Sequence, residues 1–174
     1  MPTIEFDQKF QDLCEQMIEI AFEFVDFNKK EVDTIFVFGS LEGNIIAYEL
    51  IYRINGKLSE VHNLNVASKK KYDLSDARVI SLLREGGKSL KEVRELFLQA
   101  KREVPTFLKM AYFPKIGKFN IDISYELHYT NHKEWTAGDI FNQWVEELKK
   151  SDNQENMPKQ DKGWLSKFFQ SKIF

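Results

Sequence analysis

Residues 118 to 129 alternate between apolar and polar side chains, and this alternation constrains the fold more than any other feature of the sequence. Successive side chains of a β-strand point to opposite faces. A strand with this pattern has one buried face and one solvated face, as is usual in an antiparallel sheet. We therefore predict a strand here, with these apolar positions on its buried face: Phe119, Ile121, Ile123, Tyr125, Leu127 and Tyr129.

Four more strands are predicted from runs of β-branched and aromatic residues that end at turn residues. These runs cover residues 34–38, 44–54, 57–63 and 107–113. Asn55-Gly56 is a two-residue turn signal, so the second and third runs should form an antiparallel hairpin. In the second run one face carries Ile46, Tyr48, Leu50, Tyr52 and Ile54.

Helices are predicted where apolar residues recur at spacings of three and four. The first covers about residues 6–25, and the last covers about residues 137–150. Between them, residues 76–104 have a helical pattern that Gly86-Gly87 interrupts. Two adjacent glycines cost about 2 kcal/mol relative to alanines inside a helix. We therefore expect a break there, with a second helix capped by Ser89.

The predicted order of elements is α-β-β-β-α-β-β-α, followed by a C-terminal tail. Adjacent strands without βαβ alternation are typical of the α+β class, so we expect helices packed on an antiparallel sheet of about five strands. Residues 1–150 form a single domain in this prediction. Residues 151–162 are polar and lack a period, which indicates a linker. Residues 163–174 form a short amphipathic aromatic tail.

The composition narrows the class of protein. A length of 174 residues suits one compact domain. The net charge of -2 excludes a generally basic nucleic-acid binder, and no apolar stretch approaches the roughly 20 residues of a membrane span. The N-terminus has no basic start followed by an apolar run, so we expect no signal peptide. The single cysteine, Cys14, suits a reducing compartment, and we expect a cytoplasmic protein.

The sequence carries no recognisable catalytic motif. No glycine-rich segment is followed by Lys-Ser/Thr as in a phosphate-binding loop, and no serine stands in a nucleophile elbow. Cys14 borders the apolar stripe of the first helix, where we expect a buried and inert thiol. His128, His132 and Glu134 lie close together and leave a metal-dependent enzyme as one alternative, although a loop offers such ligands little supporting structure. We expect no enzyme, no cofactor and no bound metal.

An acidic row runs along the first helix beside its apolar stripe. Like charges four residues apart destabilise a helix by about 0.2–0.5 kcal/mol per pair, so the row does not serve helix stability. It is either an ordinary solvated face or an electrostatic landing surface for a basic protein. A second acidic patch is predicted on one face of the strand 118–129, at Asp122 and Glu126. The acidic row consists of Asp12, Glu15, Glu19, Glu23 and Asp26.

The tail carries a second candidate binding feature. Trp164 and Phe168, with Leu165 and Phe169, make one apolar edge of a short helix. This edge either docks on its own domain or anchors a partner. The partner would be another protein, a second copy of the chain in a homodimer, or weakly a membrane surface.

Several segments together match the pattern of a known family. They are the first helix with the strand 34–38, the strand 43–54, Leu96-Phe97, Val104-Pro105-Thr106 and the late segment 117–126. In these features residues 5–150 resemble the YezG-like immunity (antitoxin) proteins of bacterial polymorphic toxin systems. Thr106-Phe107 stands where the family tends to place Trp after the Pro, and residues 151–174 have no counterpart.

The resemblance implies a non-enzymatic cytoplasmic protein that binds and neutralises a protein toxin, often a nuclease. Nucleases that grip phosphate are basic, so an acidic helix face would suit the occlusion of one. The acidic row, Asp122, Glu126, Trp164 and Phe168 are then the candidate partner-binding residues. The main alternative is a chaperone or adaptor for a secreted protein, which would hold a partly unfolded client on an apolar surface.

Overall fold

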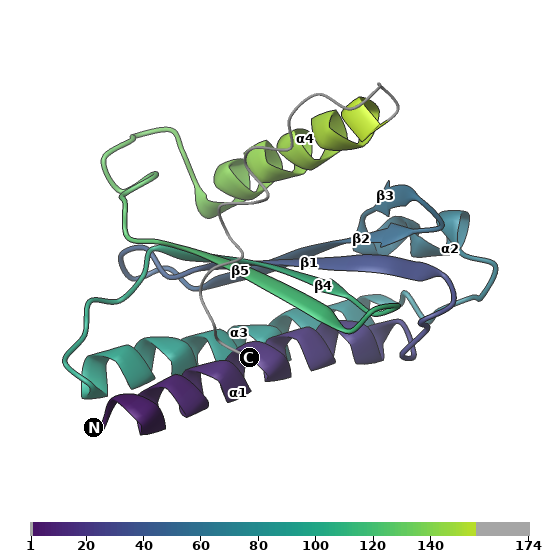
Figure 1. The fold of residues 1–174 in the computed structure, drawn as a ribbon. Helices are drawn as coiled ribbons and strands as arrows, with labels where there is room; N and C mark the ends of the chain where they lie inside the picture. Colours follow the sequence, from purple (N-terminus) through teal and green to yellow (C-terminus); the bar gives the residue numbers. More distant parts are fainter. Residues whose placement is uncertain (1, 156–174) are drawn as a thin grey trace.

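The fold is a five-stranded antiparallel sheet with helices on both faces (Figure 1). The computed structural model describes residues 2–155. The strands lie in the order β3-β2-β1-β4-β5, with α1 and α3 side by side on one face and α4 across the other. The predicted α+β class and the predicted order of helices and strands are confirmed.

The bounds of the elements are these. The helices are α1 (Thr3–Phe24), α2 (Leu64–Ala67), α3 (Asp76–Gln99) and α4 (Ala137–Glu155). The strands are β1 (Val32–Ser40), β2 (Ala47–Ile54), β3 (Lys57–Ser59), β4 (Phe107–Phe113) and β5 (Lys118–Ser124). A single 3₁₀ turn, Val61–Asn63, joins β3 to α2.

The larger part of the core lies between the sheet and the helix pair α1 and α3. Phe97 of α3 stands edge-on to Phe6 and Phe10 of α1, with ring centroids 4.9 and 5.5 Å apart. This geometry stabilises aromatic pairs beyond the apolar area that they bury. Cys14 is buried in this core, as predicted, and burial raises the pKa of its thiol to about 12. The thiol is therefore protonated and unreactive at neutral pH.

α3 is continuous from Asp76 to Gln99, so the predicted break at Gly86-Gly87 is wrong. Ser89, which we expected to cap a second helix, is buried within the same helix. A Cβ built on Gly86 would lie 2.3 Å from the ring of Tyr48 on β2. The glycine allows α3 to lie directly against the sheet, and this packing outweighs the low helix propensity of the pair.

α4 covers the opposite face of the sheet with the apolar side predicted for it. Trp144 stands edge-on to Phe36, with ring centroids 5.8 Å apart, and its ring centroid lies 6.2 Å from that of Phe38. An ion pair between Asp152 and Arg53 joins the far end of α4 to β2. The helix continues through residue 155, so the predicted linker 151–162 begins inside it.

The third predicted strand is shorter than expected. β3 ends at Ser59 rather than at residue 63. The chain then turns inward and buries Val61 and Leu64 in the core, which removes it from the edge of the sheet. Burial of two apolar side chains outweighs further pairing along this edge.

The last predicted strand is also shorter, because β5 ends at Ser124 and residues 125–129 form a loop. Tyr125 and Leu127 are exposed there, whereas the alternation predicted a buried face for them. Tyr129 is buried away from β5, and its hydroxyl lies 2.8 Å from the Ser40 hydroxyl on β1. A contact from the β1–β2 loop, described below, captures this segment.

Replacing Gly86 by alanine should lower the free energy of unfolding by about 1–3 kcal/mol, the usual cost of overpacking a core. The added methyl would meet the buried ring of Tyr48, whose hydroxyl donates to the Met17 carbonyl oxygen at 2.8 Å and so resists displacement. Gly87→Ala is the matched control, since nothing lies within 4 Å of its Cβ. Helix propensity alone should make that control more stable by up to about 1 kcal/mol. Urea unfolding measures both, and equal effects would contradict the close-approach explanation.

Candidate partner-binding surface

The middle of the predicted acidic row lies on the side of α1 that faces solvent. Asp12, Glu15 and Glu19 are all exposed. Gln8 donates a hydrogen bond of 2.8 Å to Asp12, and Gln11 donates one of 2.9 Å to Glu15. Both donors are neutral, and within residues 2–155 no cation forms an ion pair with any of the three carboxylates. No cation among the described residues therefore neutralises this trio at the surface.

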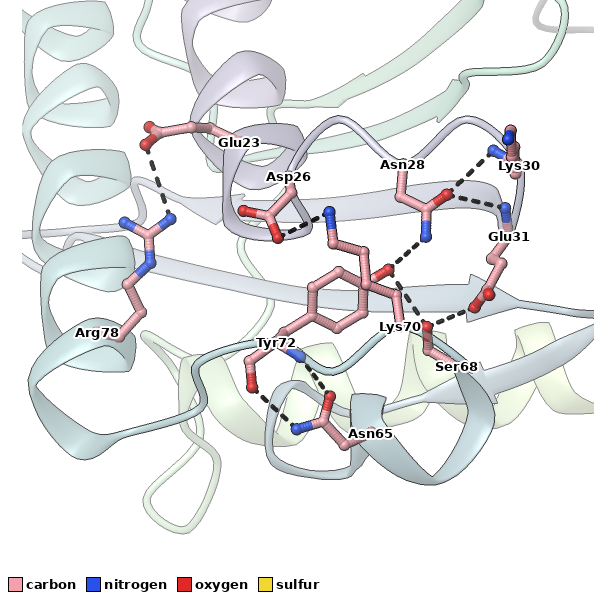
Figure 2. Close-up of polar contacts among 10 residues, drawn as sticks. All are labelled: Glu23, Asp26, Asn28, Lys30, Glu31, Asn65, Ser68, Lys70, Tyr72 and Arg78. Atoms are coloured by element: carbon pink, nitrogen blue, oxygen red, sulfur yellow. Dashed lines mark hydrogen bonds and ion pairs between the residues drawn. The ribbon is translucent and has the colours of Figure 1, made fainter.

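The C-terminal end of the acidic row is neutralised by residues that are distant in the sequence. Glu23 lies 3.7 Å from Arg78 at the start of α3, and Asp26 lies 3.1 Å from Lys70 (Figure 2). Asp26 also follows the end of α1, in a turn with a φ of 50°. The row is therefore not a uniform stripe of five carboxylates along one helix. It is an unpaired trio with an ion-paired end.

Lys70 is positioned by a polar cluster around Tyr72 (Figure 2). The Asn28 side-chain amide donates to the Tyr72 hydroxyl at 2.8 Å. The Glu31 carboxylate accepts a hydrogen bond from the Ser68 hydroxyl, and this bond is the main cause that lowers the pKa of Glu31. The segment that carries Lys70 is thus attached to the turn after α1, which keeps its ammonium group beside Asp26.

The second predicted acidic patch does not join the first. Asp122 lies on β5 directly opposite Lys109 on β4. The Lys109 ammonium lies 5.6 Å from the ring of Trp144, so both residues are on the α4 side of the sheet, away from α1. Glu126 is exposed in the loop after β5. The prediction that Asp122 and Glu126 share one strand face is wrong, because the strand ends between them.

A buried carboxylate that the sequence pattern did not reveal fixes this loop. Glu42 in the β1–β2 loop is only 2% exposed. Its carboxylate accepts the backbone N–H groups of His128, Tyr129 and Thr130 at 2.9, 3.0 and 2.7 Å, and also the Thr130 hydroxyl. Burial alone would raise the pKa of Glu42, but these hydrogen bonds together outweigh burial and lower it. The loop is thereby held across one end of the sheet.

Near Glu42, a cleft of about 540 Å³ opens between the β1–β2 loop, the end of α3 and the segment 103–106. Arg94 forms part of its wall, and its guanidinium donates to three carbonyl oxygens of the β1–β2 loop at 2.7, 2.9 and 3.0 Å. Apolar side chains exposed around a hollow are typical of a binding surface. We call this site the end cleft, and its exposed apolar side chains are Leu98, Tyr125 and Leu127.

The three residues considered for metal binding do not converge. The His128 Nε2 atom lies 3.1 Å from the Ser124 hydroxyl, and the His132 ring stacks on Trp135 with centroids 5.3 Å apart. Within residues 2–155, no group of three or more His, Cys, Asp or Glu side chains is placed to hold a metal ion. The metal-dependent enzyme built on these residues and Glu134 therefore has no support from their geometry.

Neither family models nor curated protein sequences match this chain. The functional interpretation therefore rests on the surfaces of the structure. None of the helices between residues 2 and 155 is long and apolar enough to cross a membrane. Trp164 and Phe168, the partner-binding residues predicted in the tail, lie outside the described residues.

Glu42→Gln should lower the free energy of unfolding at pH 7 by about 1.5–3 kcal/mol, the usual contribution of hydrogen bonds to a charged group. The pKa of Glu42 in the folded state lies below its ordinary value of 4.5. Ionised Glu42 therefore contributes stability above that value, and the contribution is lost as pH falls through the folded-state pKa. The difference between wild type and E42Q in urea unfolding should accordingly shrink between pH 7 and pH 3.

Glu103→Gln is the control for this comparison, since Glu103 lines the same cleft but is exposed. It should change the free energy of unfolding little at either pH. A difference between wild type and E42Q that is the same at pH 7 and pH 3 would contradict the assigned role of the Glu42 carboxylate.

Proposed function

We propose that this chain is a cytoplasmic bacterial immunity protein, which binds a basic protein toxin through the acidic row of α1 and covers the functional surface of the toxin. The observation that carries the proposal is the exposed trio Asp12, Glu15 and Glu19, whose charges no described cation pairs with. The resemblance of residues 5–150 to the YezG-like immunity proteins supports the same function.

The physical argument starts from what the trio does to α1. Carboxylates spaced three and four apart repel one another, so they weaken the helix that carries them. The three charges extend over roughly 10 Å of helix at 1.5 Å per residue. A surface of this length and sign accelerates association with a basic protein and favours it over an acidic one. A nuclease presents such a basic surface where it holds phosphates, so carboxylates placed there would compete with nucleic acid.

A chaperone for a secreted protein is the second candidate, and the end cleft is the observation that favours it. Leu98 and Leu127 are 53% and 57% exposed at its rim, beside the Tyr125 ring. A chaperone would use such apolar side chains to hold a partly unfolded client. An immunity protein would instead bind a folded toxin domain through α1, so the surface used and the folded state of the ligand separate the two functions.

Reversing the charge of the trio, as Asp12→Lys with Glu15→Lys and Glu19→Lys, should weaken toxin binding and make it less sensitive to salt. Screening acts on complementary surface charges, so removing those charges removes the salt dependence. The ligand to use is a toxin-like C-terminal domain, to be sought in an open reading frame beside the gene of this chain. Titration calorimetry across a salt series measures the affinity, and growth of cells that express the toxin domain measures protection.

The matched control reverses three exposed carboxylates on the α4 side of the molecule: Glu60, Glu134 and Glu147. Both triple variants change the net charge by the same amount, so a general charge effect would weaken both equally. The proposal requires a clear loss in the α1 variant alone. Unchanged affinity of the α1 variant at every salt concentration would contradict the proposal.

A further inference from the structure

We propose that the outer edge of β2 and the adjoining flank of α3 bind an extended segment of a partner protein as an additional strand of the sheet. β2 spans Ala47–Ile54, but β3 pairs only with Tyr52, Arg53 and Ile54. Within residues 2–155, the first part of β2 therefore has a neighbouring strand only on its β1 side. We call residues 47–51 the open edge. This inference concerns a different surface from the acidic row and does not rest on the proposed function.

In an antiparallel sheet, the backbone N–H and C=O groups of successive residues point alternately toward the two neighbouring strands. The Asn55 N–H donates to the Glu31 carbonyl oxygen on the β1 side at 2.9 Å. Odd-numbered residues of β2 thus face β1, and even-numbered residues face outward. The two-residue turn between β2 and β3 agrees, because the residues that flank such a turn form a hydrogen-bonded pair. The N–H and C=O groups of Tyr48 and Leu50 therefore point out of the open edge.

An apolar flank of α3 runs beside these groups. Gly86 lies against the Tyr48 ring, and Arg94 reaches the loop that precedes β2, so α3 follows β2 along its length. Leu83 precedes Arg94 by about three helical turns and points in the same direction. Leu83 and Ile80 are 40% and 59% exposed. A strand added at the open edge would cover these apolar side chains with every second residue.

The other face of the open edge lies under the start of α4 and holds a buried carboxylate. Glu49 lies between the two outward-facing positions, on the face opposite α3. Its Oε2 atom is buried and accepts no hydrogen bond from the described residues, and burial raises the pKa of the carboxyl group. The carboxylate lies beside Gly138 at the start of α4, so the chain itself covers this oxygen, and the contacts that select an added strand are those with the flank of α3.

The apolar flank and the charge of α3 together identify the occupant as an apolar strand with acidic residues at its ends. Arg84 and Lys91 are exposed on the same side of α3 as Ile80 and Leu83, with Lys91 about two turns beyond Leu83. Arg84 lies 3.5 Å from Glu85, an exposed ion pair that leaves it available to a second carboxylate. A second copy of the chain, paired edge to edge, would bring the same cations together. Residues 163–174 carry two lysines and no acidic side chain, so the tail of this chain has the wrong sign as well. An acidic partner strand has the complementary charge.

Hydrogen exchange of the full chain tests whether the edge is open. The amide protons of Tyr48 and Leu50 should exchange quickly, whereas those of Glu49 and Ile51, which face β1, should exchange slowly. A synthetic peptide, acetyl-Glu-Glu-Val-Thr-Val-Thr-Val-Glu-Glu-amide, serves as the probe. Adding it should slow exchange at Tyr48 and Leu50, and methylating its backbone nitrogens on one alternate set of residues should abolish the effect.

Leu83→Glu should weaken binding of the peptide by at least about tenfold, because it removes an apolar contact and repels the acidic ends. Ile80→Glu should act in the same direction, so the test survives if one variant folds poorly. Ile116→Glu is the control, since Ile116 is 71% exposed in the turn between β4 and β5 and should leave binding unchanged.

Three results would overturn the proposal. Slow exchange at Tyr48 and Leu50 in the dilute free chain would mean that the chain covers its own edge. Slow exchange that appears only at high concentration, with a dimer in sedimentation experiments, would identify a second copy as the occupant. Absence of protection by the peptide, or equal affinity of Leu83→Glu and wild type, would show that the edge takes no such strand.

Discussion

The arrangement of the layers depends on two buried tyrosines of β2 that reach the backbone of α1. Tyr48 and Tyr52 donate to the carbonyl oxygens of Met17 and Ala21 at 2.8 and 2.7 Å. Burial raises the pKa of both phenols, so they remain protonated donors. The Tyr48 ring also lies against Gly86 of α3. Tyr48 therefore sets the positions of both α1 and α3 on the sheet, and the surfaces that these two helices expose depend on this residue.

The sequence predicted those helices and strands whose structure is encoded by neighbouring residues. The first helix, the alternation of β2 and the apolar side of α4 are each legible within a short window of sequence. The break expected at Gly86-Gly87 failed because helix propensity describes an isolated helix, whereas Gly86 is placed by a contact with β2. The captured loop after β5 was missed because Glu42 and its partners lie 86 to 88 residues apart.

The same distinction between local patterns and contacts of distant residues explains the structure of the acidic row. Its exposure follows from the helical period, so the sequence located the row of five carboxylates but not the division between its unpaired and ion-paired parts. The cations beside Glu23 and Asp26 come from α3 and from the loop before it, and no spacing rule connects them to α1. Ion pairs at such exposed positions contribute little to stability. Their main effect is to shorten the surface of uncompensated negative charge to the three carboxylates in the middle of α1.

The acidic row and the open edge present different chemistry on the two sides of α3. The trio acts through side-chain charge, which attracts a partner over about a Debye length and demands little of its backbone. The edge acts through backbone hydrogen bonds, which require an extended segment at contact distance. α3 is about 10 Å across, so a bound strand and a folded basic domain need not exclude each other. Tyr48 contacts both α1 and α3 from within β2, so one side chain joins the elements that carry the two surfaces.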